Sequence, residues 1–207
     1  PLFMERTWRS PSVKGSVGLL HPEGHFMDPK AGNLREVVYR RLRRHWYFEN
    51  EASLFEEVDH HTSFSVNIYG SSREVAFIQA VGLQIIRTLE ESLVESRFGE
   101  KPGIQLREGG WDRRPHSARI VRVDNSVLGV WGRLIDDSSV PASQARLMRP
   151  LLQDHQDVLT VLAQNSAMSG TWGIRVSRCW DEKGAKVDGT MSWESAIQSS
   201  WNEVILQ

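Results

Sequence analysis

The sequence predicts an α/β fold, on three observations from its first seventy residues. Residues 16–22, SVGLLHP, form a short apolar run closed by a proline, which is typical of a buried parallel strand. A helix follows from about Leu34 to His45, with Asn33 placed to cap it. Residues 64–70, FSVNIYG, then alternate apolar and polar side chains with the period of two that a strand requires. Strand, helix and strand in this order predict a sheet covered by helices.

A direct connection between two strands predicts where this sheet ends. The aromatic run Trp46–Phe48 is a strand candidate, and only the acidic stretch 49–62 separates it from the strand at 64–70. This fits the far edge of an α/β sheet, where an antiparallel strand is often added to a parallel set. We therefore expect an antiparallel edge strand here. A further strand at 74–81 and a helix at 83–98 complete this half.

The composition changes after Lys101-Pro102-Gly103, where a stretch rich in glycine, arginine and proline predicts a loop. We place a boundary there, between residues 1–100 and a mixed α+β region at 101–207. The elements expected in this second region are a strand at 119–123, a helix at 126–136 capped by Asp124, a helix at 144–165 interrupted or restarted at Pro150, and short tryptophan-rich strands over 168–207.

Composition excludes several classes of protein. The formal net charge is −1, so the chain lacks the basic balance of a small autonomous nucleic-acid binder, and any DNA contact must be local. The single cysteine, Cys179, excludes an internal disulfide and fits a reducing compartment. No apolar run approaches the roughly 20 residues that span a bilayer. We expect a cytoplasmic protein that makes no membrane contact.

The two ends of the chain suggest a piece of a longer protein. The first residue is Pro1, without an initiator methionine, and the chain stops on the apolar run Val204-Ile205-Leu206-Gln207. Natural domain ends are usually polar. We therefore expect a fragment, although a natural short protein stays open.

Histidines are frequent in the first half, but their spacing argues against a metal site. The adjacent His60 and His61 point to opposite faces if extended, and no HExxH-type spacing occurs. Ordinary polar loop histidines explain the pattern better. The five histidines concerned are His21, His25, His45, His60 and His61.

Other catalytic patterns are also absent. The sequence contains no GxSxG elbow and no phosphate-cradling GxxxxGK[ST] or GxGxxG loop. Arg175 and Arg178 could lower the pKa of Cys179, but a packed or surface cysteine is the simpler interpretation. The carboxylates between Glu49 and Asp59 suit a solvated loop better than a glycosidase pair. We therefore assign no catalytic residue and no metal ligand.

Two basic stretches are candidates for DNA contact. The helix at 34–45 carries several arginines, of which Arg40, Arg43 and Arg44 could neutralise phosphates, although a solvated helix face explains them more simply. The loop from Arg107 to Arg119 mixes arginine with an aromatic side chain and could touch the DNA backbone or a base. Its candidate residues are Arg107, Trp111, Arg113 and Arg114.

Residues 18–70 add a resemblance to a known family. They resemble the second half of the methyltransferase domain in large restriction-modification and phage-defence DNA methyltransferases. In that family a proline-closed strand is followed by a helix with LR…YRRLR, then by N-E-x-x-LF-x-EV-x-H and an F-S-V-N-I-Y-G strand. The matching residues here are Leu34-Arg35, Tyr39 to Arg43, Asn50-Glu51, Leu54-Phe55, Glu57-Val58, His60 and Phe64 to Gly70. The likeness continues through residues 109–124 and 187–195.

The resemblance implies the later half of a class I methyltransferase sheet, which is Rossmann-like, followed by a region leading toward target recognition. The implied activity of the parent protein is transfer of a methyl group from S-adenosylmethionine to a base amino group in double-stranded DNA, expected to be adenine N6, after base flipping. The family's cofactor turn and Asn-Pro-Pro-Tyr motif are absent, so we expect no cofactor binding by this segment alone and count the missing N-terminal half as its partner. A non-catalytic DNA-binding or specificity module, or a degenerate remnant, are the alternatives.

Overall fold

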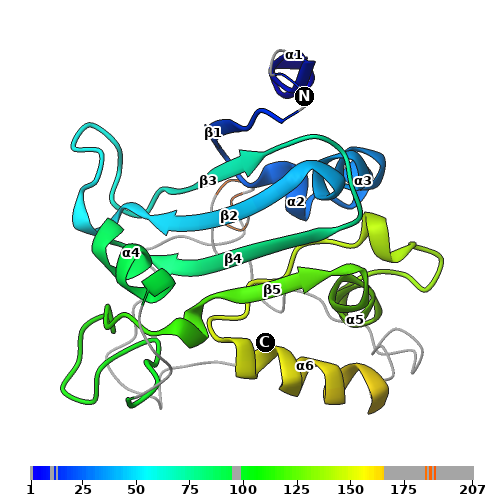
Figure 1. The fold of residues 1–207 in the computed structure, drawn as a ribbon. Coiled ribbons are helices and arrows are strands. Elements are labelled where there is room, and N and C mark those ends of the chain that lie inside the picture. The colour runs from blue at the N-terminus through cyan, green and yellow to red at the C-terminus, as the bar shows by residue number, and fades with distance from the viewer. Residues whose placement is uncertain are drawn as a thin grey trace. The chain divides into compact units, whose positions relative to one another are not determined.

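A computed structural model of the chain describes residues 2–9, 12, 14–94, 99–165, 185, 187 and 189. Residues 1–166 form one compact unit and residues 167–207 a second. The predictions for 168–207 lie outside the described residues apart from three positions. The first unit contains one five-stranded mixed sheet in the order β1-β3-β2-β4-β5, drawn in Figure 1.

The strands and helices have the following bounds. The strands are β1 (Val17–His21), β2 (Leu42–Glu49), β3 (Ser63–Tyr69), β4 (Ala76–Leu83) and β5 (Val121–Asp124). The α-helices are α1 (Leu2–Arg9), α2 (Gly24–Met27), α3 (Gly32–Arg41), α4 (Ile86–Val94), α5 (Asn125–Ile135) and α6 (Gln153–Asn165). Short 3-10 turns are η1 (Pro29–Ala31), η2 (Asn50–Ala52), η3 (Ser117–Arg119) and η4 (Ala142–Gln144). Within the described ranges, no helix is long and apolar enough to cross a membrane.

The α/β prediction is confirmed, but the strand order is not that of a Rossmann sheet. Only β2 and β4 pair in parallel, and the pairs β1–β3, β3–β2 and β4–β5 are antiparallel. The antiparallel strand expected at the edge is β3, and it lies inside the sheet because both of its sides are paired. The strands that stand at the two edges, β1 and β5, each pair antiparallel with their neighbour. The prediction of a buried parallel strand at 16–22 is also wrong, because β1 is an edge strand with alternating exposure.

The arginine-rich helix ends earlier than its periodicity predicts. α3 stops at Arg41, and Leu42 is already extended and fully buried. Arg43 and Arg44 therefore belong to β2, not to a helix. The aromatic run that follows buries Trp46, Tyr47 and Phe48 in the sheet, and this burial outweighs the local preference for helix. The carbonyl oxygens at the helix end accept hydrogen bonds from the Arg43 guanidinium, at 3.3 Å from Arg40 O and 2.9 Å from Arg41 O.

In the second half, the strand β5 and the helix α5 lie where the sequence predicts them. The Asp124 side chain caps α5 by accepting a 3.0 Å hydrogen bond from Val127 N. The prediction of a helix over 144–165 is wrong for residues 145–152, which run as an extended segment, and α6 begins only at Gln153. The division at residue 100 stays a prediction, and β5 joins the same sheet as the first four strands.

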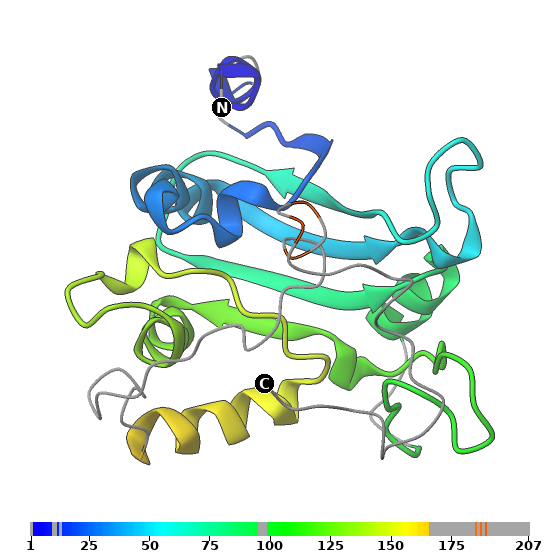
Figure 2. The same cartoon turned by 180° about the vertical axis from the view of Figure 1, so that it is seen from behind.

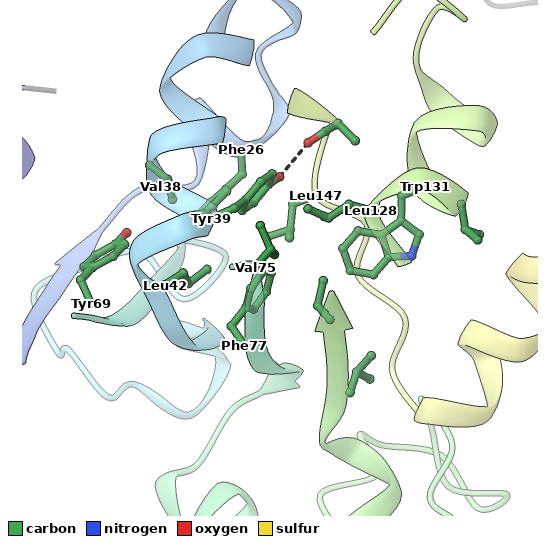
Figure 3. Close-up of a cluster of buried hydrophobic side chains, with 14 of the residues drawn as sticks. Phe26, Val38, Tyr39, Leu42, Tyr69, Val75, Phe77, Leu128, Trp131 and Leu147 are labelled. Atoms are coloured by element: carbon green, nitrogen blue, oxygen red, sulfur yellow. Dashed lines mark hydrogen bonds between the residues drawn. The ribbon is translucent and has the colours of Figure 1, made fainter. Parts of the chain in front are cut away.

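Helices and the extended segment cover one face of the sheet, and α4 covers part of the other. Seen from behind, α2, α3 and the chain from η4 to α6 pass in front of the strands (Figure 2). Their apolar side chains form the main core, in which Tyr39 and Phe26 from the helices meet Phe77 from β4 and Trp131 from α5 (Figure 3). A smaller core under α4 contains Trp46, Phe48, Phe64, Ala80, Leu83 and Leu89.

Candidate nucleic-acid interface

A row of side chains crosses three strands on the face opposite the main core. Arg44 on β2 lies opposite Ile78 on β4, and Ile78 lies opposite Arg122 on β5. Residues paired directly across strands share a face. Arg44 and Arg122 are both exposed, while their neighbours Val121 and Val123 turn into the main core. The alternation of the strands therefore places two guanidinium groups on one outer surface.

Two further arginines extend this surface. Arg73, in the turn between β3 and β4, lines a shallow hollow of about 500 Å³ together with Arg44 and Arg122. Arg73 also lines a second hollow of about 520 Å³ with Arg40. The backbone joins the two, because Arg73 N donates a 3.0 Å hydrogen bond to Arg40 O. We call Arg40, Arg44, Arg73 and Arg122 the arginine face.

Few protein groups compensate these charges. Arg40 pairs with Glu36 at 3.4 Å in an exposed i,i+4 arrangement, which contributes little in water. Arg73 donates to the carbonyl oxygen of Ala76 at 2.8 Å. Across the described residues, no hydrogen bond or ion pair occupies the Arg44 or Arg122 guanidinium. These two groups are the most available for an external anion.

Arg43 was predicted as a DNA contact, but its guanidinium is used within the fold. It donates to Arg41 O at 2.9 Å, to Leu42 O at 3.1 Å and also to Ser71 O. Partial burial, together with the nearby charge of Arg73, lowers the pKa of Arg43 below its usual range. Arg43 therefore holds the end of α3 against the turn after β3.

The second predicted site, the loop from Arg107 to Arg119, is a hairpin-like excursion. Gln105 and Trp111 form an isolated antiparallel bridge, and Gly109 and Gly110 between them adopt φ values of 95° and 83°. Such positive angles favour glycine. The loop is anchored by buried Arg119, which donates to Asp112 O at 2.6 Å and Arg114 O at 2.9 Å.

The loop arginines differ in how far they are free to bind DNA. Arg114 makes a bidentate pair with Asp112 and a 2.9 Å bond to Glu100, so its charge is compensated. The hydrogen bonds from Arg114 hold the pKa of Asp112 well below its usual range. Arg113 Nε donates to Gln84 Oε1 at 2.7 Å. Arg107 is exposed near the tip of the loop.

Trp111 lines a cavity at the other end of the sheet from the arginine face. The cavity of about 260 Å³ lies where β2 and β4 end, and Tyr47, Glu49 and Arg149 also line it. The predicted residues thus fall into two separate places: Arg40 and Arg44 on the arginine face, and Trp111 at this cavity.

The sequence did not point to Arg73 and Arg122 of the arginine face, or to the residues that line the cavity other than Trp111. Arg122 could have been found, because it stands between two valines in VRVD and must point away from the core side of the strand. Arg73 carries no such signal. The residues of the cavity come from positions 47 to 151, and no local spacing connects them.

The histidines divide into two groups. His60 and His61 lie in the acidic loop, as predicted, with their rings 3.9 Å apart. His21 and His45 are on strands, with His45 fully buried, and His25 is in α2, so the prediction of loop histidines is wrong for these three. Burial of an aromatic ring against Phe26 explains why β2 tolerates His45 there. Within the described ranges, no three histidine, cysteine or acidic side chains are grouped to hold a metal ion.

The buried histidines belong to a polar cluster beneath α2. His45 Nε2 lies 3.2 Å from Glu23 Oε2, and His21 Nε2 lies 2.9 Å from the Tyr69 hydroxyl. Desolvation lowers the pKa of His45 to about 3 and that of His25 to about 4, so both rings are neutral at pH 7. Desolvation also raises the pKa of Glu23. The cluster thus contains one buried imidazole, His45, against the Glu23 carboxyl group, and two half-buried imidazoles, His21 and His25.

Comparison with known proteins adds no identity. No protein-family model matches the chain, no curated protein matches its sequence, and no solved structure matches its fold.

Proposed function

We propose that this chain is the DNA-contacting, non-catalytic part of an S-adenosylmethionine-dependent DNA methyltransferase. The observation that carries the DNA contact is the arginine face, in which Arg44 and Arg122 project from adjacent regions of one sheet surface. Guanidinium groups bind phosphate through charge-assisted hydrogen bonds, and each phosphate neutralised releases counterions from the duplex. This contact is independent of DNA sequence.

The assignment to a methyltransferase is supported by the resemblance of residues 18–70. A class I methyltransferase sheet is expected to combine parallel strands with an added antiparallel one. β3 is such a strand, running antiparallel between β1 and β2, which point the same way. In the described sheet β1 is paired on one side only, and the proposal places the missing half of the domain against its other side.

The described residues do not fit the cofactor. The turn after β1 is formed by Pro22 and the buried Glu23, and it offers none of the glycine-rich backbone that holds a cofactor in this family. S-adenosylmethionine is therefore assigned to the parent protein, and no step of methyl transfer is given to this chain. Isothermal calorimetry with the purified chain should detect no S-adenosylmethionine binding, and micromolar affinity would contradict this assignment.

A salt titration of DNA affinity tests the arginine face. We compare the chain with an R44Q/R122Q variant on a 20-base-pair duplex, measuring the dissociation constant by fluorescence anisotropy over a range of salt concentrations. Each phosphate contact contributes about 0.9 to the slope of log affinity against log salt, so the variant should lose about 1.8. The control is R9Q/R87Q, which removes two exposed arginines that are paired on their own helices. Equal slopes for the two variants would overturn the proposed contact.

The alternative is a free-standing DNA-binding module, which would use the same arginine face. Reconstitution of methylation distinguishes it from the enzyme proposal. If the enzyme proposal is right, co-expression with a segment carrying the cofactor turn and an Asn-Pro-Pro-Tyr motif from the same reading frame should yield methylated DNA. Methylation should not appear with this chain alone. A reading frame that encodes neither motif upstream would favour the module.

A further inference from the structure

The cavity at the ends of β2 and β4 is formed by a local irregularity of the sheet. The pairing between these parallel strands shifts from Trp46↔Ala80 to Phe48↔Leu83, so β4 carries one extra residue there. Gly82 lies in this bulge with φ 62°, a conformation that favours glycine. Bulges of this kind bend a strand and are frequent next to binding sites. The open end of a parallel pair is also where ligands bind in α/β sheets.

Two flat groups that can stack on a ligand line the cavity, the Arg149 guanidinium and the Trp111 indole. The Arg149 guanidinium lies over the Tyr47 ring, with 4.2 Å between its central carbon and the ring centroid. Both residues line the cavity, and so does Trp111, whose side chain comes from the loop and is 39% exposed. An indole and a guanidinium plane are surfaces on which a flat aromatic ring stacks favourably.

Most polar groups at the cavity are already paired. The Asp112 carboxylate accepts from the Arg114 guanidinium, and Gln84 Oε1 accepts from Arg113. The Arg119 guanidinium donates to backbone carbonyl oxygens. Two groups differ. In the described part of the chain, the Glu49 carboxylate has no hydrogen bond or ion pair, and the buried Nε of Arg149 has no hydrogen-bond partner. Of these two, only the Glu49 carboxylate is an unused group offered to a ligand, because the Arg149 Nε lies toward Glu23.

The charges favour a neutral ligand over an anion. The charge of Arg149 is partly compensated by Glu23, whose Oε2 lies 3.9 Å from its Nε. Glu49 adds a negative charge that nothing in the described ranges neutralises. A carboxylate accepts from N–H groups, as Glu and Asp do from the exocyclic amino group of cytosine. With two arginines and two carboxylates in its lining, the cavity gives a phosphate no net attraction.

The volume limits the ligand to one ring system. At about 260 Å³, the cavity is smaller than the roughly 300 Å³ at which sites for drug-sized molecules begin. From the stacking surfaces, the free carboxylate and this size, we propose that the cavity binds an unpaired nucleobase carrying an exocyclic amino group. Trp111 and Arg149 stack the base, and Glu49 accepts from its amino group. The proposal deepens the proposed function, since a base is what a DNA-contacting chain meets.

Free nucleosides test this site without involving phosphate contacts. The full chain is labelled at the indole nitrogen of its 8 tryptophans and titrated with cytidine, adenosine and thymidine. The Trp111 signal, assigned with W111F, should shift at millimolar cytidine or adenosine, and at least threefold more weakly with thymidine, which has no exocyclic amino group. Equal shifts for all three nucleosides, or none, would overturn the proposal.

Variants separate stacking from amino-group selection. W111A should weaken binding of every nucleoside at least fivefold, whereas W111F retains an aromatic plane and should lose less than twofold. E49L, which has no hydrogen-bond acceptor in its side chain, should remove the preference over thymidine without abolishing binding. R9Q, which changes an exposed arginine paired with Glu5 on α1, is the control and should bind nucleosides unchanged. Free nucleosides carry no phosphate, so failure of the arginine face leaves this test informative. Circular dichroism confirms that each variant is folded, and a folded E49L that keeps the preference would exclude Glu49 as the selecting group.

Discussion

The hydroxyl of Tyr39 donates a 2.7 Å hydrogen bond to the carbonyl oxygen of Ala145 (Figure 3). Both residues are fully buried, and 106 positions separate them in the chain. The bond fixes α3 to the extended segment before α6. Arg35 makes a second connection, donating from Nε to Gln144 O at 2.9 Å.

Replacing Tyr39 by phenylalanine should lower the free energy of unfolding by about 1 to 3 kcal/mol, because a buried carbonyl oxygen loses its partner. Urea unfolding followed by circular dichroism measures the change. Tyr47 is the matched control, since no hydrogen bond of its hydroxyl occurs in the described part of the chain. Y47F should cost less, and an equal loss in both variants would show that the Tyr39 bond contributes nothing specific.

Arg119 should be essential to the loop that carries Trp111. Its guanidinium is buried and donates to two loop carbonyls, so R119M leaves Asp112 O and Arg114 O without these donors. We expect a loss of about 2 to 4 kcal/mol, as for two broken buried bonds, and faster trypsin cleavage after Arg113. R107M, at an exposed position of the same loop, is the control. Cleavage at the wild-type rate in R119M would refute the anchoring role.

Stability should fall in mild acid because of His25 and His45. Their pKa values in the folded chain, about 4 and about 3, lie below the ordinary value of 6.5, so the unfolded chain binds more protons between these limits. Each histidine then lowers stability by at most about 1.4 kcal/mol per pH unit as the pH falls below about 6.5. Burial raises the pKa of Glu23 above 4.5 in the folded chain, so the folded chain takes up this proton first. Glu23 therefore adds stability as the pH falls toward 4.5.

Urea unfolding at pH 7.5 and pH 5.0 measures this dependence. H45Q should flatten it by removing one titrating ring, even if the variant is less stable at both values. H60Q changes an exposed ring and should leave the dependence as in the wild type. An H45Q variant with an unchanged pH slope would mean that His45 does not titrate on unfolding.

Gly82 should resist substitution. Its φ of 62° is unfavourable for other residues, and an added Cβ would lie 3.2 Å from Leu151 Cδ1. G82A should therefore lose about 1 to 2 kcal/mol. Gly24 is the control, because a Cβ there meets nothing within 4 Å and the residue is in a helix, where alanine is favoured. Equal stabilities of the two variants would argue against a strained bulge.

Local patterns predicted the elements well where one signal dominated. The alternation in FSVNIYG predicts β3, and the aspartate before an apolar run predicts the start of α5 at Asp124. The end of α3 could not be predicted in this way, because the helical spacing of LREVVYRRL continues through Leu42. Only the pairing of β2 with two other strands shows that these residues are extended.

The candidate sites were predictable in part. Arg40 and Arg44 stand out as basic residues in the sequence, but their alignment with Arg122 depends on strand register. Sequence also gave no sign that Arg43 and Arg114 would be occupied by carbonyl and carboxylate partners. The cavity joins Glu49, Trp111 and Arg149, and long-range packing alone brings them together.

The position of β3 between β1 and β2 has a consequence for the order of folding. Among the described strands β1 is synthesised first, and within them it pairs only with β3, from Val17↔Tyr69 to His21↔Ser65. In this sheet β1 has no partner until the ribosome has released residue 69, whereas β2 and β3 can form a hairpin as soon as both exist. The hairpin is thus the expected nucleus, and β1 the strand most exposed to misassembly during translation.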